Sequence, residues 1–145
     1  RTAAGGAGAV YGFDSFRGLP EAWEGLAAGA LSTQGRVPFS HMHVDWHRGW
    51  FNATVPRFES QLLRLGRRIA FLHVDCDLFE SALEVFRGLA PVLAPEGSLV
   101  VLDEAFHGEL RALWQAAGEH GWALDVLGLA GEGEGKGAPE RRRDL

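Results

Sequence analysis

Short apolar runs alternate with amphipathic stretches along this chain, and this alternation constrains the fold more than any other feature. Strands are expected over residues 9–13, 41–46, 68–74, 97–102 and 122–129, and helices over residues 51–66, 81–93 and 108–121. The runs IAFLHV and SLVVL lack the period-two alternation of a half-exposed strand, which favours strands covered on both faces. The pattern therefore predicts an α/β fold of βαβ units, with a mostly parallel sheet and flanking helices.

The ends of the chain differ in composition from the middle. Residues 1–8 are mostly small, and residues 130–145 are rich in glycine and charge, so neither end buries enough apolar surface to offset its ordering entropy. We expect a flexible end at residues 1–8, one partial domain at residues 9–129 and a disordered tail at residues 130–145. The 145 residues, 46% of them hydrophobic, suffice for one core.

Charge and cysteine content argue against several classes of function. The formal net charge is −5, and arginine pairs such as Arg67 and Arg68 are too scattered to follow a phosphate backbone, so no nucleic-acid partner is expected. No apolar run approaches the roughly 20 residues of a membrane span, and the N-terminal residues lack the apolar stretch of a secretory signal. We therefore expect a cytoplasmic protein without a membrane partner. A single cysteine, Cys76, excludes an internal disulfide and a zinc site held by a cysteine pair.

Carboxylates follow three of the expected strands, at the points where the chain leaves the sheet. They are Asp14, Asp75, Asp77, Asp103 and Glu104. Ligands of a parallel α/β sheet bind beyond the carboxyl ends of its strands, so these acids are expected on one rim. Carboxylates that share a rim repel one another unless they are neutralised, and the only lysine, Lys136, lies in the tail. A divalent cation is the simplest counter-charge, and oxygen-only ligands suit Mg²⁺.

Some of these acids also have a purely structural interpretation. Asp77 precedes an expected helix and suits a helix cap, whereas Asp75 ends its strand directly and is the better candidate for a metal or catalytic role. Asp14 could cap the turn DSFRGLP that follows it. His73 lies inside an apolar run and is expected to be a core histidine.

The chain contains four longer motifs in a fixed order. They are VYGFDSFRGLPEAW, GWFNATVPRF, AFLHVDCDLFESALEVFRGLAPVL and GSLVVLDEAF. Their order and spacing, over roughly residues 9–129, resemble the macrocin O-methyltransferase-like group of class I S-adenosylmethionine-dependent methyltransferases. The resemblance implies a partial Rossmann-like sheet. It also implies methyl transfer from S-adenosylmethionine to a hydroxyl of a small molecule, such as a secondary-metabolite sugar. A homo-oligomer is compatible with the sequence.

The resemblance also implies roles for individual residues of the cofactor site. Asp14 stands where the acid that ends the second strand of the family fold binds the cofactor ribose. Trp50 and Phe51 stand at the helix start that lies close to the adenine. The Gly-rich turn that wraps the methionine part of the cofactor has no counterpart, because no apolar strand precedes GGAG at residues 5–8. We therefore expect a domain that lacks part of its cofactor site and that binds S-adenosylmethionine weakly.

On the acceptor side, the resemblance places a metal and a base. Asp75, Asp103 and Glu104 match the three acidic metal positions of the family. Asp75 would also lie near the substrate hydroxyl as a candidate base. His107, close to the acidic rim, is a candidate substrate contact.

Other classes of protein also use an apolar strand followed by Asp-x-Asp. A haloacid-dehalogenase-type phosphatase needs a basic residue, usually lysine, to balance the phosphate charge, and no lysine lies between Asp77 and Asp103. A nucleotide-sugar glycosyltransferase that holds its metal and diphosphate through Asp-x-Asp stays open, although it does not explain VYGFDSFRGLPE. An inactive or truncated methyltransferase fragment is the remaining alternative.

Overall fold

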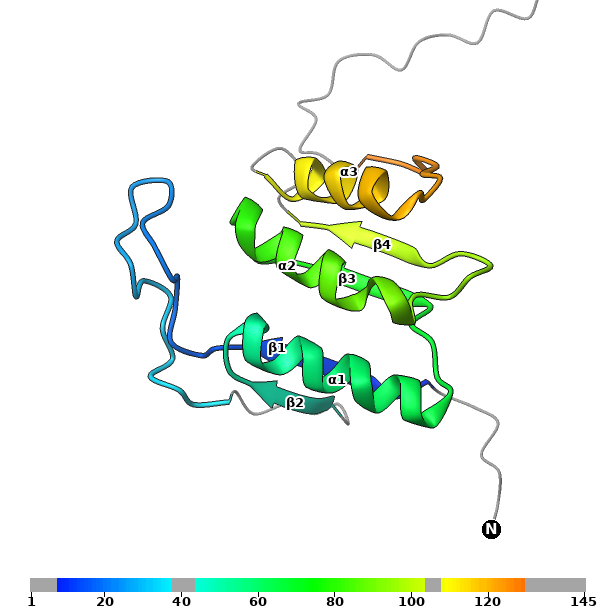
Figure 1. The fold of residues 1–145 in the computed structure, drawn as a ribbon. Helices are drawn as coiled ribbons and strands as arrows, with labels where there is room; N and C mark the ends of the chain where they lie inside the picture. Colours follow the sequence, from blue (N-terminus) through cyan, green and yellow to red (C-terminus); the bar gives the residue numbers. More distant parts are fainter. Residues whose placement is uncertain (1–7, 38–43, 104–107, 130–145) are drawn as a thin grey trace, which may run out of the picture.

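The computed structural model describes residues 8–37, 44–103 and 108–129. The elements follow one another as β1 (Val10–Asp14), β2 (Val44–Arg48), α1 (Phe51–Leu65), β3 (Phe71–Val74), α2 (Phe79–Leu89), the 3₁₀ helix η1 (Ala90–Val92), β4 (Leu99–Leu102) and α3 (Glu109–His120). The order confirms the predicted α/β alternation (Figure 1). No described helix is long and apolar enough to cross a membrane.

The strands form two parallel pairs. β1 pairs with β2 from Val10 opposite Val44 onward, and β3 pairs with β4 from Phe71 opposite Leu99 onward. The parallel direction agrees with the prediction, because a helix or long loop connects the strands of each pair. In the view of Figure 1, α1 lies in front of β1 and β2, and α2 lies in front of β3.

The two pairs are separate sheets rather than one. Residues of both β1 and β3 line a cavity of about 1170 Å³. Strands that share backbone hydrogen bonds lie about 4.8 Å apart, and among the described residues no such bonds join β1 to β3. The predicted mostly parallel sheet is therefore split in two in the described part of the chain.

Two apolar clusters hold the helices on the strands, and α2 contributes to both. The first packs α1 against α2 and η1 through Val55, Phe58, Leu62, Val85, Leu89 and Val92. The second packs α2 against β3 and α3 through Val74, Ala82, Leu83, Phe86, Ala112 and Ala116. Helices α1 and α2 cross closely at Gly88, where an added Cβ would collide with the Val55 side chain. The left-handed caps Gly66 and Gly121 end α1 and α3, at the residues where the expected helices end.

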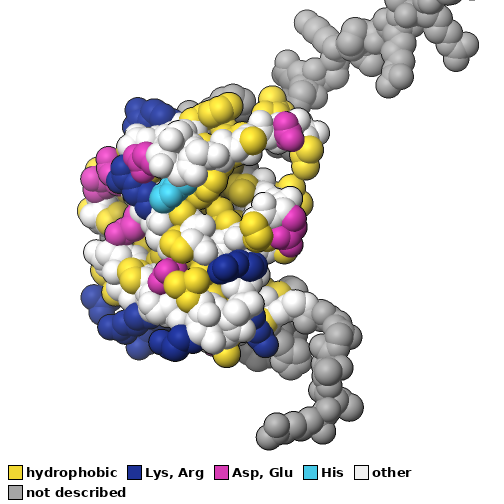
Figure 2. Space-filling view, turned by 45° about the vertical axis from the view of Figure 1, so that its right-hand side comes forward, with side chains coloured by type: hydrophobic (Ala, Val, Ile, Leu, Met, Phe, Trp, Pro, Cys, Tyr) yellow, Lys and Arg dark blue, Asp and Glu magenta, His cyan; other side chains and the backbone are white. Residues whose placement is uncertain are grey.

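The expectation that β3 and β4 are covered on both faces was wrong. Phe71 and Leu99, which lie opposite each other, are 58% and 47% exposed, whereas Val74 on β3 is buried against the helices. Side chains alternate between the faces of a strand, so α2 and α3 cover one face only. Exposed hydrophobic side chains are scattered over the face drawn in Figure 2.

The predicted strand over residues 122–129 was also wrong. These residues form no strand, and Leu127 is 82% exposed. An apolar run becomes a strand only where a neighbouring strand supplies backbone partners. Among the described residues, the only partner of β4 in its sheet is β3, and no strand pairs with residues 122–129.

Candidate functional site

A cavity of about 870 Å³ lies at the carboxyl ends of β1 and β3. Four of the residues predicted for the site line it, and they come from three separate segments of the chain: Asp14, Trp50, Phe51 and Asp75. This is the position where parallel α/β sheets bind their ligands. The structure thus brings together the residues predicted for cofactor binding and the residue predicted as base.

Asp14 is the last residue of β1 and is exposed at the cavity. Its Oδ1 accepts a hydrogen bond from the Phe16 backbone N–H at 2.7 Å, and its backbone carbonyl accepts one from the Gly49 N–H at 2.9 Å. The turn-capping interpretation of Asp14 is therefore correct. A carboxylate has about four acceptor positions, so capping one N–H leaves acceptors for a ligand.

The segment after Asp14 forms one wall of the cavity. Phe16 is buried, and its ring meets the Trp46 ring edge-on with centroids 5.5 Å apart. Gly18 has φ of 82°, and an added Cβ would collide with the backbone carbonyl of Ala30, so only glycine fits there. Leu19 donates its N–H to the same carbonyl at 2.9 Å, which closes the loop. The motif DSFRGLP thus shapes the cavity wall.

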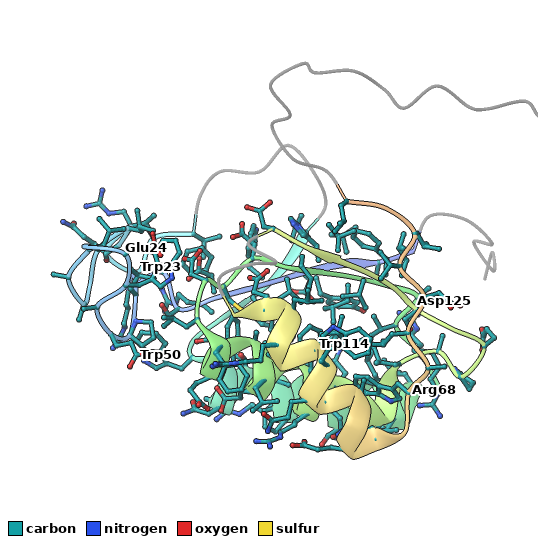
Figure 3. The ribbon with its side chains drawn as sticks, turned by 90° about the horizontal axis from the view of Figure 1, so that it is seen from above. Trp23, Glu24, Trp50, Arg68, Trp114 and Asp125 are labelled. Carbon is teal, nitrogen blue, oxygen red and sulfur yellow. The ribbon has the colours of Figure 1, made fainter. Side chains whose placement is uncertain are left out.

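Trp50 and Phe51 begin α1 beside this wall. Trp50 is the N-cap and is 40% exposed, and its backbone carbonyl accepts a hydrogen bond from the Thr54 hydroxyl at 3.1 Å. Figure 3 shows Trp50 at the same end of the molecule as Trp23 and Glu24 of the preceding loop, whereas Arg68 and Asp125 lie at the other end. An exposed indole at a cavity offers a flat apolar surface for an aromatic ligand.

A tight turn carries the acids after β3. Asp77 has φ of 61°, in the left-handed region that Asp tolerates better than most residues, and the Leu78 N–H bonds the Cys76 carbonyl at 2.6 Å. Asp75 and Asp77 both line the cavity. The predicted helix-cap role of Asp77 was wrong, because Leu78 is the N-cap of α2 and makes no side-chain cap. Asp77 lies in the left-handed turn, one residue before the N-cap position.

Cys76, between these two acids, has a raised thiol pKa. Burial raises the pKa of its thiol to about 12, and the nearby carboxylates of Glu109, Asp77 and Asp75 add to the rise. A thiol with this pKa is neutral at physiological pH, so Cys76 is no thiolate nucleophile.

Asp103 follows β4 as predicted, on the exposed side of the pair. Its N–H bonds the Val74 carbonyl at 3.0 Å, so Asp103 and Asp75 continue the β3–β4 register as neighbours. The expectation that His73 is a core histidine was wrong, because its side chain is half-exposed and its Nε2 lies 4.0 Å from an Asp103 oxygen. His73 faces the uncovered side of β3, opposite the helices.

The predicted metal triad is only partly within the described residues. Asp75 and Asp103 are neighbours with oxygen donors that suit Mg²⁺, whereas Glu104 lies outside the described residues, as does His107. Within residues 8–37, 44–103 and 108–129, no group of three or more His, Cys, Asp or Glu side chains is placed to hold a metal ion. The metal prediction therefore depends on Glu104.

The sequence prediction missed residues of two helices, three that line this cavity and one that contacts its acidic turn. Glu80, Glu84 and Arg87 of α2 line the cavity, and their spacing of four and three residues could have placed them on one helix face. Glu109 was missed as well, and no local signal reveals it, since an acid in the first turn of a helix is ordinarily exposed.

Comparison with known proteins identifies relatives of the chain. A family model described as "Methyltransferase domain" matches residues 1–105. A curated relative from Streptomyces olivaceus, 8-demethyl-8-(2,3-dimethoxy-alpha-L-rhamnosyl)-tetracenomycin-C 4'-O-methyltransferase, is 26% identical over 86% of this chain and 52% of its own length. Among solved structures, the calicheamicin methyltransferase CalS11 matches 82% of this chain and 56% of its own, with a TM-score of 0.62 and 23% identity. This chain thus spans about half the length of each relative.

Proposed function

Since the chain belongs to the methyltransferase-domain family, as its motifs predict, we propose that the protein transfers a methyl group from S-adenosylmethionine to a hydroxyl oxygen of a small molecule. One observation carries the proposal: Asp14, Trp50, Phe51 and Asp75, from separate segments, line one cavity at the carboxyl ends of two parallel strands. The class I methyltransferase fold of CalS11 supports the same reading of the architecture.

We assign the cofactor side of the cavity to β1 and the start of α1. The Asp14 carboxylate accepts hydrogen bonds from the ribose hydroxyls, at the acceptor positions that the Phe16 N–H leaves unused. Trp50 and Phe51 contact the adenine ring through their aromatic faces. The bound cofactor supplies a methyl group on a positively charged sulfur, so the task of the protein is to orient the acceptor and accept its proton.

We assign the acceptor side to the turn after β3. Asp75 takes the proton of the acceptor hydroxyl as general base. Mg²⁺ assistance is part of the proposal, with Asp75, Asp103 and Glu104 as ligands, and its support is the register that makes Asp75 and Asp103 neighbours. A divalent ion there would lower the pKa of the acceptor hydroxyl. His107 stays a predicted substrate contact.

The class of substrate is proposed from the relatives. The Streptomyces olivaceus relative is named for methylating the 4'-hydroxyl of a rhamnosyl tetracenomycin, so a sugar of a secondary metabolite is the first acceptor to test. We favour methyl transfer over the glycosyltransferase alternative, because the matched residues 1–105 include Asp-x-Asp. Cytoplasmic location and a homo-oligomer stay predictions.

The test uses the protein at its full natural length. Incubation with S-adenosylmethionine and a panel of glycosylated acceptors, followed by mass analysis, should yield a singly methylated sugar, and chelation with EDTA should lower the rate. The matched control is Asp75→Asn, which keeps shape and removes the base. If the full-length protein neither binds S-adenosylmethionine in calorimetry nor methylates any acceptor, the proposal is wrong and the alternative of an inactive methyltransferase is favoured.

A further inference from the structure

Glu109 is the first residue of α3, and its side chain is 0% exposed. Carboxylates are almost never fully buried unless hydrogen bonds compensate for the lost water. The residue does not line the cavity of the proposed active site. A buried acid beside that cavity therefore needs a separate explanation.

The Glu109 carboxylate reaches the turn that carries Asp75. Its Oε1 accepts a hydrogen bond from the Cys76 backbone N–H at 2.9 Å, from a residue 33 positions earlier in the chain. Cys76 stands between Asp75 and Asp77, which both line the cavity. The contact thus connects α3 directly to the segment that presents the proposed base.

The turn is fixed from three directions. β4 holds its start, because the Asp103 N–H bonds the Val74 carbonyl at 3.0 Å, and the turn closes on itself through the Leu78 N–H and the Cys76 carbonyl. Glu109 holds the middle. A backbone N–H inside a turn is costly to leave without a partner, so this third contact selects among the directions that the turn can take.

The start of α3 packs closely against the start of α2. Gly108, the N-cap, has φ of 140°, and a Cβ added there would lie 3.1 Å from the Phe79 backbone nitrogen at the start of α2. Glycine thus permits the two helix starts to touch. This close approach determines the position of the Glu109 carboxylate relative to the Cys76 N–H.

We propose that Glu109 is a positioning residue for methyl transfer: its hydrogen bond to the Cys76 N–H directs the Asp75 carboxylate into the cavity. The inference rests on the proposed function, since it assumes that Asp75 is the base. Glu109 does not line the cavity in which the cofactor and acceptor are proposed to bind. Its effect on the site passes through the backbone of the turn, at the Cys76 N–H.

Two conservative variants of the full-length protein separate this role from a general role in folding. Glu109→Gln keeps a carbonyl oxygen at the same distance along the side chain, whereas Glu109→Asp keeps the charge and withdraws the oxygen by one methylene. Displacement of a catalytic group by about 1 Å costs on the order of 100-fold in rate. We expect kcat near the wild-type value for Glu109→Gln and about 100-fold lower for Glu109→Asp, with KM for S-adenosylmethionine unchanged in both. Glu119→Gln, an exposed position on the same helix, is the matched control.

A second readout does not depend on activity. Hydrogen exchange of the Cys76 amide should be slow in the wild type and in Glu109→Gln, and faster in Glu109→Asp. Equal kcat in both variants, or equal Cys76 exchange, overturns the positioning role, as does a Glu109→Gln variant that fails to fold. A wild-type protein without methyl transfer overturns the proposed function instead, and the Cys76 exchange then still decides whether Glu109 holds the turn.

Discussion

The two strand pairs present their acids at the same cavity but support them differently. Asp14, after β1, is held by the N–H of Phe16, two residues further along the chain. The turn after β3 is held at Cys76 by Glu109, 33 residues away. A ligand contact that tolerates small displacements can depend on a local turn, whereas a base that must be oriented benefits from support by a distant element. The difference agrees with binding at β1 and chemistry at β3.

The packing beneath the two pairs differs as well. Under β1 and β2 the contacts are largely aromatic, with the Phe13 ring stacked on His47 at 4.6 Å and Phe58 against Tyr11 at 4.6 Å. Under β3 and β4 most of them are aliphatic around the single buried ring of Phe86, with Ala112 and Ala116 of α3 fully buried. Small residues let α3 approach α2 closely, and this approach is what brings Glu109 to the turn.

Substitution of the two acids after β3 should give the largest effect. Asp75→Asn removes the proposed base and should lower kcat by about 100-fold or more. Asp77→Asn should leave kcat within a few-fold, because Asn tolerates the left-handed backbone as Asp does. Turnover and thermal midpoint of both variants, measured side by side, test this. If Asp77→Asn is the inactive variant, a diphosphate-binding Asp-x-Asp site becomes the better interpretation.

Truncation of Phe86 should weaken the packing under β3. Phe86 of α2 is buried in the apolar cluster that joins α2 to β3 and α3, so Phe86→Ala should lower the free energy of unfolding by about 3–5 kcal/mol. The control is Leu65→Ala at an exposed position, expected within about 0.5 kcal/mol of wild type. Urea denaturation gives both values. Equal losses for the two variants would contradict the assigned core.

Removal of the Asp14 charge should affect binding more than turnover. Asp14→Asn weakens the acceptor offered to the ribose and should raise the Kd for S-adenosylmethionine about 10-fold, which corresponds to ~1.4 kcal/mol. The kcat at saturating cofactor should stay near wild type. Calorimetry and saturation kinetics measure the two effects separately. A fall in kcat without a change in Kd would exchange the roles assigned to the two pairs.

The smallest effect should come from the exposed pair between α2 and α3. The Arg87 guanidinium bonds the Glu119 carboxylate at 2.6 Å and lowers the pKa of Glu119 from 4.5 to about 2. Because the folded-state pKa is depressed, the pair stabilises the fold above pH 4.5 and loses its effect as the pH falls towards 2. The difference in thermal midpoint between wild type and Glu119→Gln should be small at pH 7 and shrink at about pH 3 and in high salt. A difference that grows in acid would contradict this.

Local patterns predicted two helices closely, and also the ends of β3 and β4. The helix expected over residues 51–66 spans Phe51–Leu65, and the one expected over residues 108–121 spans Glu109–His120. Both succeed because an apolar period of about 3.6 residues and a terminal glycine are properties of neighbouring residues. The placement of Asp14 and Asp75 at one cavity agrees with the rule that ligands of α/β proteins bind beyond the carboxyl ends of the strands.

The features that the sequence did not predict are those that depend on distant contacts. Residues 122–129 are apolar enough for a strand, but in the described structure no strand edge meets them. The exposure of Phe71 depends on which elements pack against that face of β3. The sequence of the strand alone does not reveal those distant elements. The burial of Glu109 depends on a turn 33 residues away.

A structure of the full-length protein with S-adenosylhomocysteine tests the central claim most directly. We expect the ribose hydroxyls within hydrogen-bond distance of the Asp14 carboxylate, the adenine against Trp50 or Phe51, and the sulfur turned towards Asp75. A ligand bound outside this cavity, without contact to Asp14, would contradict the assignment of the two strand pairs to one methyl-transfer site.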